Sequence, residues 1–243
     1  MIDGTCCPHG QQVFSAKWCI HMKKYQILYE DRDLFVLYKP PGLPVQSARP
    51  SVPDVMSQLS NDLRDRTGKM PHLHLVNRLD QPVEGIFLVA GNERAAADLS
   101  RQVNDHLHME KWYRALVCGK LPEEEGILVD YLVKDGRTNM SRVVPKGTKD
   151  ARRSELQYRV LQEWEDRSLL EIRLLTGRHH QIRVQLAHAG TPIEGDAKYG
   201  RVDMGGSRQL CLCSFKTTFL HPRTKKPMTF QVEPTFPVPP TAL

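Results

Sequence analysis

The sequence predicts an α+β fold built on one mixed, largely antiparallel central sheet with flanking helices. Three observations predict this class. Short apolar or alternating runs of strand length recur along most of the 243 residues, whereas helical spacing occurs in few segments. Several strand-like runs follow each other as adjacent pairs, which favours antiparallel neighbours. No internal repeat or interdomain linker is evident, so we expect one domain over residues 23–243, after an N-terminal extension over residues 1–22.

The expected strands are runs of aliphatic, β-branched and aromatic residues bounded by turn formers. The first pair ends at Lys39-Pro40-Pro41-Gly42-Leu43-Pro44, because three prolines and a glycine cannot continue a central strand. In a later run, Tyr113, Ala115 and Val117 alternate onto one face. The expected strands span residues 26–29, 34–38, 86–90, 111–117, 156–162, 168–175, 210–215 and 228–232.

Apolar residues recur at helical spacing over residues 54–66, 93–109 and 181–190. In the last segment Arg183 lies one position off the apolar stripe, where it can reach back toward the sheet. Gly190 is a helix stop there. The three stripes are Val55, Leu59 and Leu63; Ala95, Leu99, Val103 and Leu107, with Asp98 away from the stripe; and Ile182, Leu186 and Ala189.

Positive charge is concentrated in one segment of the chain. The net charge is +6, and residues 133–153 alone carry seven Lys and Arg against two Asp and Glu, which is +5. A concentrated basic segment suits a polyanion better than a diffuse basic surface does. The segment shows no sustained period, so we expect a long loop or an irregular hairpin. A solvated loop without a partner is the alternative.

Composition argues against several classes of protein. No apolar run reaches the roughly 20 residues that span a bilayer, and no secretory signal is visible, so we expect a soluble, cytoplasmic protein. The six cysteines include no C-x-x-C pair and lack zinc spacing. His180 and His188 would lie about 12 Å apart on a helix, too far for one ion. We therefore expect no metal.

The segment His74–Gly85 leads into an apolar strand and carries the residue pattern on which the functional hypothesis depends. It places Arg78 and Asp80 two positions apart, and Pro82 and Gly85 mark a loop. A carboxylate on a loop held by a scaffold is a candidate working residue. On residue types alone, a turn aspartate paired with a nearby arginine explains the segment as well.

Four segments, in this order and spacing, resemble the RluA-type pseudouridine synthase family. The resemblance covers nearly the whole chain and implies the pseudouridine synthase fold, with a catalytic cleft. The segments are Ile27-Leu28-Tyr29-Glu30-Asp31 through Lys39-Pro40-Pro41-Gly42-Leu43-Pro44-Val45; Asn77-Arg78-Leu79-Asp80 with Gly85; Lys111-Trp112-Tyr113-Arg114-Ala115-Leu116-Val117 with Gly119; and Thr176-Gly177-Arg178-His179-His180-Gln181-Ile182-Arg183-Val184 through Gly195-Asp196 to Tyr199-Gly200.

The resemblance implies isomerisation of uridine to pseudouridine in RNA, without a cofactor. By this resemblance Asp80 is the catalytic carboxylate, acting either as a nucleophile or as a base. Arg183 would keep that carboxylate ionised, and Tyr113 would stack beneath the target base. Arg78 would fill the space that the flipped base leaves, and Ile182 would pack against uracil. Without the family pattern, ordinary packing and a structural ion pair remain alternatives for these residues.

The implied partner is a structured ribosomal or transfer RNA, bound by a monomer without a membrane or a metal. Arg178 and the arginines of the basic segment, Arg152 and Arg153, are the candidate RNA-binding residues beyond the cleft. They would supply the grip on the substrate, since the small N-terminal RNA-binding domain found in many family members is not evident in this sequence.

Four positions depart from the family pattern. Asn77 and Gln185 stand where histidine is usual, His179 replaces a threonine, and Glu84 replaces a serine or threonine. We expect Glu84 to point outward or to pair with a cation. The departures leave two rival hypotheses open. The chain is a degenerate member that binds RNA without catalysis, or it is a hydrolase that uses Asp80 and Glu84 as paired carboxylates.

Overall fold

The computed structural model describes residues 5–6, 12–14, 25–47, 49, 51–105, 108–200 and 209–240. These residues form an α+β fold with a large, mostly antiparallel sheet, which confirms the expected class. The chain divides into two compact units, Met1–Glu110 with Ser214–Glu233 and Lys111–Cys213 with Pro234–Leu243, and each is described by itself. Among the described residues, no helix is both long and apolar enough to cross a membrane.

The first unit contains a sheet that explains the early hairpin of the sequence. β3 pairs with β4 and β4 with β6, all antiparallel, and β5 runs along β6. β6 neighbours β12, β12 is antiparallel to β13, and β13 pairs in parallel with β2. Two short strands fall within residues 1–22. The strands are β1 (Thr5–Cys6), β2 (Gln12–Phe14), β3 (Gln26–Glu30), β4 (Leu34–Lys39), β5 (His74–Leu75), β6 (Glu84–Ala90), β12 (Leu212–Leu220, whose first two residues belong to the second unit) and β13 (Pro227–Gln231).

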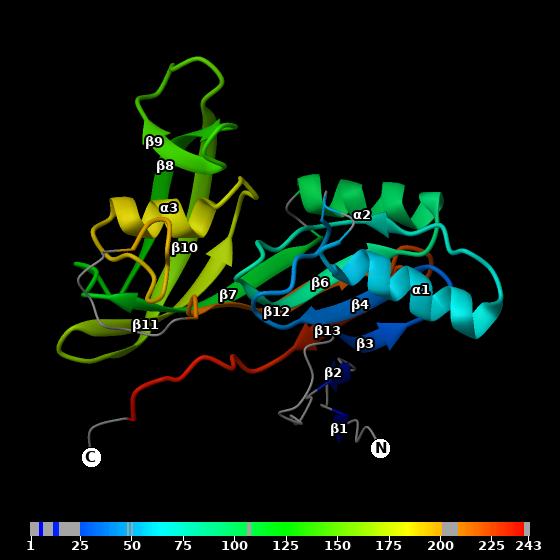
Figure 1. The fold of residues 1–243 in the computed structure, drawn as a ribbon. Coiled ribbons are helices and arrows are strands. Elements are labelled where there is room, and N and C mark those ends of the chain that lie inside the picture. Colours follow the sequence, from blue (N-terminus) through cyan, green and yellow to red (C-terminus); the bar gives the residue numbers. More distant parts are fainter. Residues whose placement is uncertain are drawn as a thin grey trace. The chain divides into compact units, whose positions relative to one another are not determined.

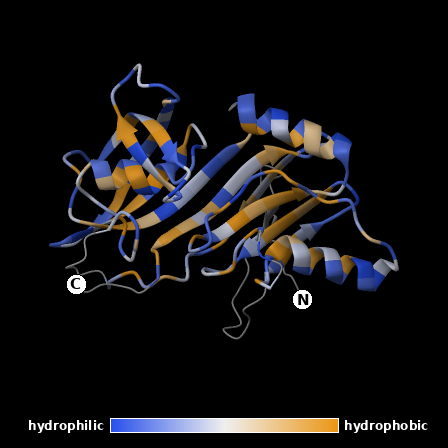
Figure 2. Cartoon of the chain, turned by 45° about the horizontal axis from the view of Figure 1, so that its top comes forward, coloured by the Kyte–Doolittle hydropathy of each residue, from blue (hydrophilic) through white to orange (hydrophobic). Residues whose placement is uncertain are grey.

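The centre of this sheet is buried, and that burial includes charged side chains. Every residue of β4 and of β6 is buried. The helices of this unit are α1 (Val55–Thr67) and α2 (Glu93–Asp105), and α2 contacts β5 and β6 (Figure 1). Figure 2 shows the contrast between the mainly hydrophobic strands and the largely hydrophilic helices. Lys39 and Glu84 lie at strand ends within this apolar layer, so each needs polar partners there.

The stripe of α1 is confirmed, and that of α2 is confirmed in part, since Val103 is only partly buried. Val55, Leu59 and Leu63 are buried on α1, as are Ala95 and Leu99 on α2. Leu107, at the end of the expected stripe, lies outside the described residues.

Asp98, expected on the polar side of α2, is instead buried. It accepts hydrogen bonds from Gln102 at 2.8 Å and from Lys225. Lys225 comes from the loop after β12, so its contact with α2 could not be seen in the local spacing.

The second unit is an antiparallel sheet in the order β7, β11, β10, β8, β9, with α3 against β8 and β9 (Figure 1). Ile182 and Leu186 are buried on α3, but Ala189, expected on the same stripe, is exposed. All residues from Gln181 to Leu186 are buried, so this helix has no solvent-facing side along that length. The elements are β7 (Glu110–Cys118), β8 (Glu125–Asp135), β9 (Met140–Val144), β10 (Arg152–Glu163), β11 (Arg167–Leu174) and α3 (Gln181–His188).

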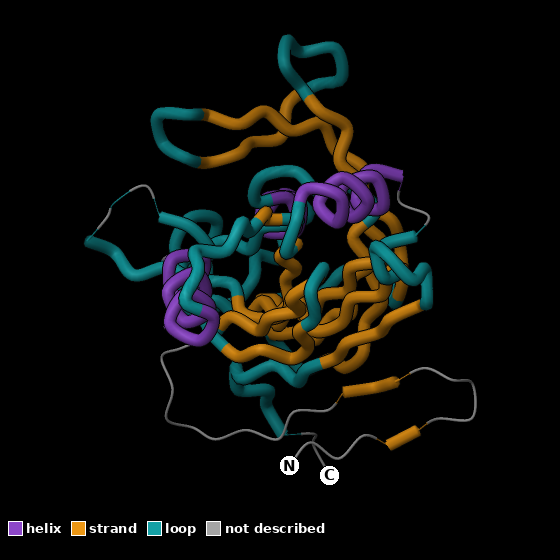
Figure 3. Tube along the Cα trace, turned by 90° about the vertical axis from the view of Figure 1, so that its right-hand side faces the viewer, coloured by secondary structure: helices purple, strands orange, loops and turns teal. Residues whose placement is uncertain are grey.

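The basic segment includes a hairpin, one of the two expected alternatives. Instead of a long loop, it forms the end of β8, the whole of β9 and the start of β10, with a short loop over residues 145–151. The β8–β9 hairpin extends from the rest of the second unit (Figure 1 and Figure 3). β9 is absent from the expected strands because its five residues, MSRVV, show no alternation, and the strand is defined by its pairing with β8.

Candidate active site

Asp80 lies in the first unit, on the loop between β5 and β6, and it is partly buried. The loop is tied down on both sides. Val83 N–H donates to the Asp80 carbonyl at 3.0 Å, and Leu88 N–H donates to Asn77 Oδ1 at 2.8 Å. Gln81 exchanges hydrogen bonds with Gly42, each at 3.0 Å. A carboxylate on such a loop is held without being part of a strand.

Gly85 explains why this loop enters β6 where it does. Its φ is +120°, and a Cβ at this position would lie 2.3 Å from the Ser214 carbonyl oxygen of β12. Only glycine fits so close to a backbone, in a conformation that other residues rarely adopt. Ser214 Oγ in turn donates to the Ile86 carbonyl at 3.1 Å. The loop is therefore fixed at its end by contact between two strands.

Lys39 is fully buried behind the same loop. Its ammonium donates to the Pro40 carbonyl at 3.0 Å and to the Gln81 carbonyl at 2.9 Å. Burial lowers the pKa of Lys39 to about 7, although the carboxylates of Asp80 and Glu84 raise it. The lysine that begins the Lys-Pro-Pro-Gly segment thus joins that segment to the residue next to Asp80.

Glu84 does not point outward, contrary to the first of the two expectations for it. The residue is fully buried, and its Oε2 accepts a hydrogen bond from Tyr38 OH at 2.8 Å. Its charge also raises the pKa of Lys39. Glu84 therefore belongs to the buried support of the loop.

In the second unit, Arg183 lies on α3, and its guanidinium group binds Asp196 through two hydrogen bonds. Nε donates to Asp196 Oδ2 at 2.8 Å and Nη2 to Oδ1 at 2.7 Å, and both side chains are buried. Burial by itself would raise the pKa of Asp196, but Arg183 and the backbone N–H groups of Lys198 and Tyr199 lower it overall. This bidentate pair fixes the direction of the guanidinium group.

A chain of polar contacts joins the start of α3 to β9 of the β8–β9 hairpin. Ser141 of β9 donates its backbone N–H to Tyr199 OH at 2.7 Å, and Tyr199 OH pairs with His180 Nδ1 at 2.9 Å. The Ser141 hydroxyl lies 3.0 Å from His179 Nδ1, and the two imidazoles stack with centroids 3.8 Å apart. The Arg183 guanidinium carbon lies 5.3 Å from the Tyr199 ring centroid. Hydrogen bonds through Tyr199 therefore connect the start of α3 to the β8–β9 hairpin.

Tyr113 is buried on β7, on the face expected from its alternation. Ile182, next to Arg183 on α3, is buried as well. Lys111, two residues before Tyr113, shares its face and is only 6% exposed. Burial lowers the pKa of the Lys111 ammonium group.

The candidate RNA-binding arginines are all exposed, and three of them belong to the second unit. Arg178 Nε donates to the Arg153 carbonyl at 3.3 Å, so the turn before α3 meets the start of β10. Arg153 also pairs with Glu155. Arg152 is adjacent to Arg153, and Arg78 lies in the first unit on the Asp80 loop.

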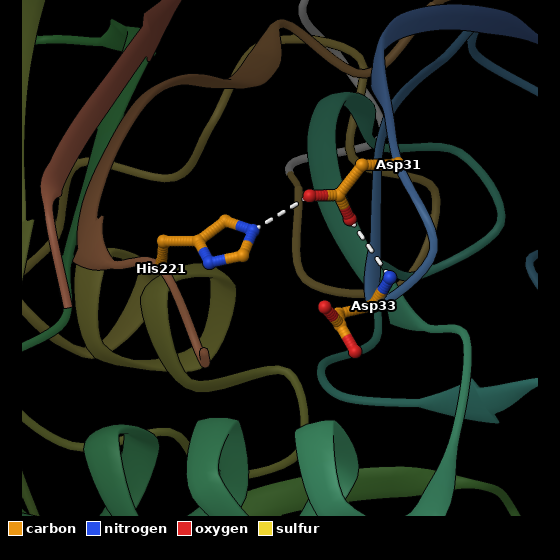
Figure 4. A group of neighbouring side chains, drawn as sticks. All are labelled: Asp31, Asp33 and His221. Carbon is orange, nitrogen blue, oxygen red and sulfur yellow. Dashed lines mark hydrogen bonds and ion pairs between the residues drawn. The ribbon is translucent and has the colours of Figure 1, made fainter. Parts of the chain in front are cut away.

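One group in the first unit has the composition of a metal site. Oxygen and nitrogen atoms of Asp31, Asp33 and His221 lie within 4.8 Å of one another (Figure 4). His221 Nε2 lies 2.8 Å from Asp31 Oδ2, and His221 Nδ1 accepts backbone N–H bonds from Arg223 and Thr224.

The two carboxylates of this group are also engaged. Asp31 Oδ1 accepts two backbone N–H bonds of its own turn, and Asp33 pairs with Arg223 Nε at 2.8 Å. These contacts join the β3–β4 turn to the loop after β12, which is a structural role for the group.

Comparison with known proteins identifies the family. The model of the RNA pseudouridylate synthase family matches residues 33–188. An uncharacterized RNA pseudouridine synthase of Bacillus subtilis, YlyB, is 30% identical over 84% of this chain and 67% of its own length. Ribosomal large subunit pseudouridine synthase C of Vibrio vulnificus is 32% identical over 83% and 63% of the two chains. Synthase D of Nitrosomonas europaea is 34% identical over 72% and 50%.

Two solved structures share the fold. Human RNA pseudouridylate synthase domain containing 4 superposes with a TM-score of 0.69 at 22% identity, covering 86% of this chain and 88% of its own. Human RNA pseudouridylate synthase domain containing 1 gives 0.68 at 23% identity, covering 86% and 83%. At these identities the likeness concerns the fold.

The chain therefore belongs to the RNA pseudouridylate synthase family, a class of isomerases that act on RNA. The relatives named synthases C and D confirm the resemblance to its RluA-type members. The chain spans 67%, 63% and 50% of the length of the three relatives given above.

Sequence reasoning missed three residues of the candidate site. Lys39, Lys111 and Asp196 all lie in segments that carried the resemblance, but no role was assigned to them. The signal available was a charged residue inside an otherwise apolar or motif-bound run. What decides their importance is burial, and burial depends on partners far away in sequence.

Proposed function

We propose that this chain isomerises uridine to pseudouridine in RNA, with Asp80 as the catalytic carboxylate. The observation that carries the proposal is the family match over residues 33–188, which includes Asp80 on a loop held by Lys39, Asn77 and Gly85. The proposed catalytic domain spans residues 23–243, acts in the cytoplasm as a monomer, and is preceded by the extension 1–22.

The reaction requires no cofactor. The bond from N1 to the ribose breaks, a bond from C5 to the same ribose carbon forms, and the proton lost from C5 is balanced by one gained at N1. Because pairing and stacking hold uridine inside folded RNA, the base must first be turned out. Asp80 then acts on the ribose, as a nucleophile at its anomeric carbon or as a base.

The other site residues support this carboxylate. Tyr113 provides a ring on which the turned-out uracil stacks, and Ile182 packs against its edge. Arg78 fills the space that the base leaves. Arg183 is the cation that the family resemblance assigns to the Asp80 carboxylate. Asp196 binds the Arg183 guanidinium through two hydrogen bonds and so fixes its orientation on α3.

Replacing Asp80 tests the central assignment. RNA from a strain that lacks the gene is incubated with purified protein, and the pseudouridines formed are mapped. We expect the Asp80→Asn protein to form none. Large-subunit ribosomal RNA is the first substrate to try, because two relatives bear that name. Asp65→Asn, at an exposed aspartate of the same unit, is the control and should retain full activity. Pseudouridine made at the wild-type rate by Asp80→Asn would refute the assignment.

In this proposal the basic segment over residues 133–153 and the turn before α3 bind the RNA. Arg152, Arg153 and Arg178 are exposed, and Arg178 contacts the backbone of Arg153. If these side chains bind phosphates, the double variant Arg152→Gln/Arg153→Gln should lower the slope of log affinity against log salt concentration. The expected reduction is about 0.7 to 0.9 for each phosphate that the variant no longer neutralises. An unchanged slope would identify the segment as a solvated hairpin.

The rival hypotheses are less well supported. A paired-carboxylate hydrolase needs Asp80 and Glu84 to face a sugar together, but Glu84 is fully buried and bound by Tyr38. In a degenerate member that only binds RNA, we expect the residues that depart from the family pattern to make no structural hydrogen bonds. Asn77 instead holds β6, and Gln185 Nε2 donates to Asp130 at 2.9 Å. RNA binding without pseudouridine formation in any cellular RNA would favour the degenerate member.

A further inference from the structure

Lys111 is a buried cation to which the described part of the chain offers no partner. Its side chain is 6% exposed, and it lies on the face of β7 that also carries Tyr113. Among the residues that the structure describes, its ammonium group has no hydrogen bond and no ion pair. Burial alone lowers the pKa of Lys111, with no charged group acting on it. The sequence motifs gave it no role.

The position of the ammonium is well defined. Trp112 pairs with Arg173 of β11, so Lys111 lies beside the end of that strand, where the turn into α3 begins. A Cβ at Gly177 would lie 3.6 Å from Lys111 Nζ. The ammonium is therefore next to the turn Thr176–His180. That turn also holds Arg178, whose side chain is exposed.

Such an arrangement is unfavourable for a protein without a ligand. A buried charge is normally paired or satisfied by several hydrogen bonds, because removing it from water is costly. Other buried ions of this chain follow that rule: Arg183 has Asp196, and Lys39 has two carbonyl groups. The exception at Lys111 is explained if an anion from outside the chain completes the site.

We propose that the Lys111 ammonium and the Thr176–His180 turn bind a phosphodiester group of the RNA, next to the nucleotide that lies on Tyr113. The proposal rests on the function proposed above, which places the target base on Tyr113. Two residues along a strand span about 7 Å, comparable to the reach from a base to its own backbone phosphate. α3 starts at this turn without a side-chain cap, so its dipole adds to the attraction for an anion.

The salt dependence of RNA binding tests the contact. Binding of a uridine-containing fragment of large-subunit ribosomal RNA is measured over a range of KCl concentrations, with Asp80→Asn in every protein so that the RNA stays unchanged. Lys111→Gln should bind several-fold more weakly and lower the salt slope by about 0.7, the value for one phosphate of a single strand. Lys111→Arg should keep the slope, because it keeps the charge.

Lys120→Gln is the matched control, since Lys120 follows the other end of β7 and pairs with Glu163. It should bind like the parent protein. If Lys111→Gln keeps the parent slope while folding normally by circular dichroism, the proposal is wrong. The readout is binding, so it remains informative even if Asp80 proves not to be catalytic.

A second measurement identifies the phosphate without altering the protein. Once the target uridine has been mapped, single methylphosphonate linkages replace the phosphates on its 5′ and 3′ sides. One of the two substitutions should weaken binding to protein with Lys111 and have no further effect with Lys111→Gln. Equal losses in both proteins, or no loss at either linkage, would overturn the assignment. A fall in kcat with unchanged KM in Lys111→Gln would also do so, because it would mean that Lys111 acts on the reacting atoms.

Discussion

The two units of this chain each bury a lysine in a motif segment, and the two lysines are treated in opposite ways. Lys39 of the first unit is fully buried, donates to two carbonyl oxygens and has Asp80 and Glu84 nearby. Lys111 of the second unit is almost as deeply buried but has no partner among the described residues. The two lysines therefore differ in whether the described residues offer their ammonium groups polar partners.

The difference separates support from recognition. A buried cation satisfied by the protein stabilises the arrangement around it, and here that arrangement is the loop of Asp80. A buried cation left without an anion reduces stability, which is reasonable only where a substrate restores the balance. In our proposals the first unit holds the catalytic carboxylate, and the second unit holds a binding position for the RNA backbone.

The largest expected effect is the loss of stability in Lys39→Met. Methionine fills similar space but leaves Glu84 buried without its cation and the Gln81 carbonyl without a donor. Leaving a buried polar group without its hydrogen-bond partner costs about 1–3 kcal/mol in the free energy of unfolding, and Lys39 serves two carbonyl groups. Urea titration of both proteins measures it. Lys69→Met, at an exposed lysine of the same unit, should change the free energy by less than about 0.5 kcal/mol.

If Lys39→Met were as stable as the wild type, Lys39 would not stabilise the Asp80 loop, and the proposed difference between Lys39 and Lys111 would be wrong. The double variant Lys39→Met/Glu84→Gln sharpens it. Removing both buried charges should recover part of the lost stability. Pseudouridine formation should stay low, since the Asp80 loop is then without the Lys39 ammonium that holds it.

Next in size is a dependence of stability on pH that belongs to Lys39. Its pKa is about 7 in the folded chain, below the ordinary value of 10.5. Between these two values the unfolded chain binds more protons at this site, so stability rises with pH through the window. The rise is at most about 1.4 kcal/mol per pH unit. The difference in unfolding free energy between wild type and Lys39→Met, followed from about pH 7 to about pH 9.5, should grow accordingly. A constant difference would contradict it.

Local patterns in the sequence predicted most of the fold. The β3–β4 hairpin follows from two short apolar runs separated by a turn, and the apolar stripes of α1 and α2 follow from helical spacing; both signals act between residues close in the chain. The misses depend on distant partners. The buried Asp98 is bound by Lys225, which is far away in sequence, and β9 is defined by its pairing with β8.

The same distinction applies to the site. Family resemblance supplied Asp80, Tyr113 and Arg183 as candidates, because motifs preserve residue types. It did not show that Glu84 lies inward against Tyr38, since that depends on the pairing of β4 with β6. Nor did it distinguish the two lysines, because their difference is only in what surrounds them.

The smallest expected effect has the opposite sign and is the sharpest test of the comparison. Lys111→Met keeps the apolar stem but removes a buried charge that has no counter-charge in the described chain. It should therefore raise the free energy of unfolding by about 1 kcal/mol. Thermal unfolding without RNA should show a higher midpoint than the wild type. With saturating ribosomal RNA the order should reverse, because the ligand stabilises most the protein that binds it more tightly. A loss of stability without RNA would mean that Lys111 supports the fold as Lys39 does.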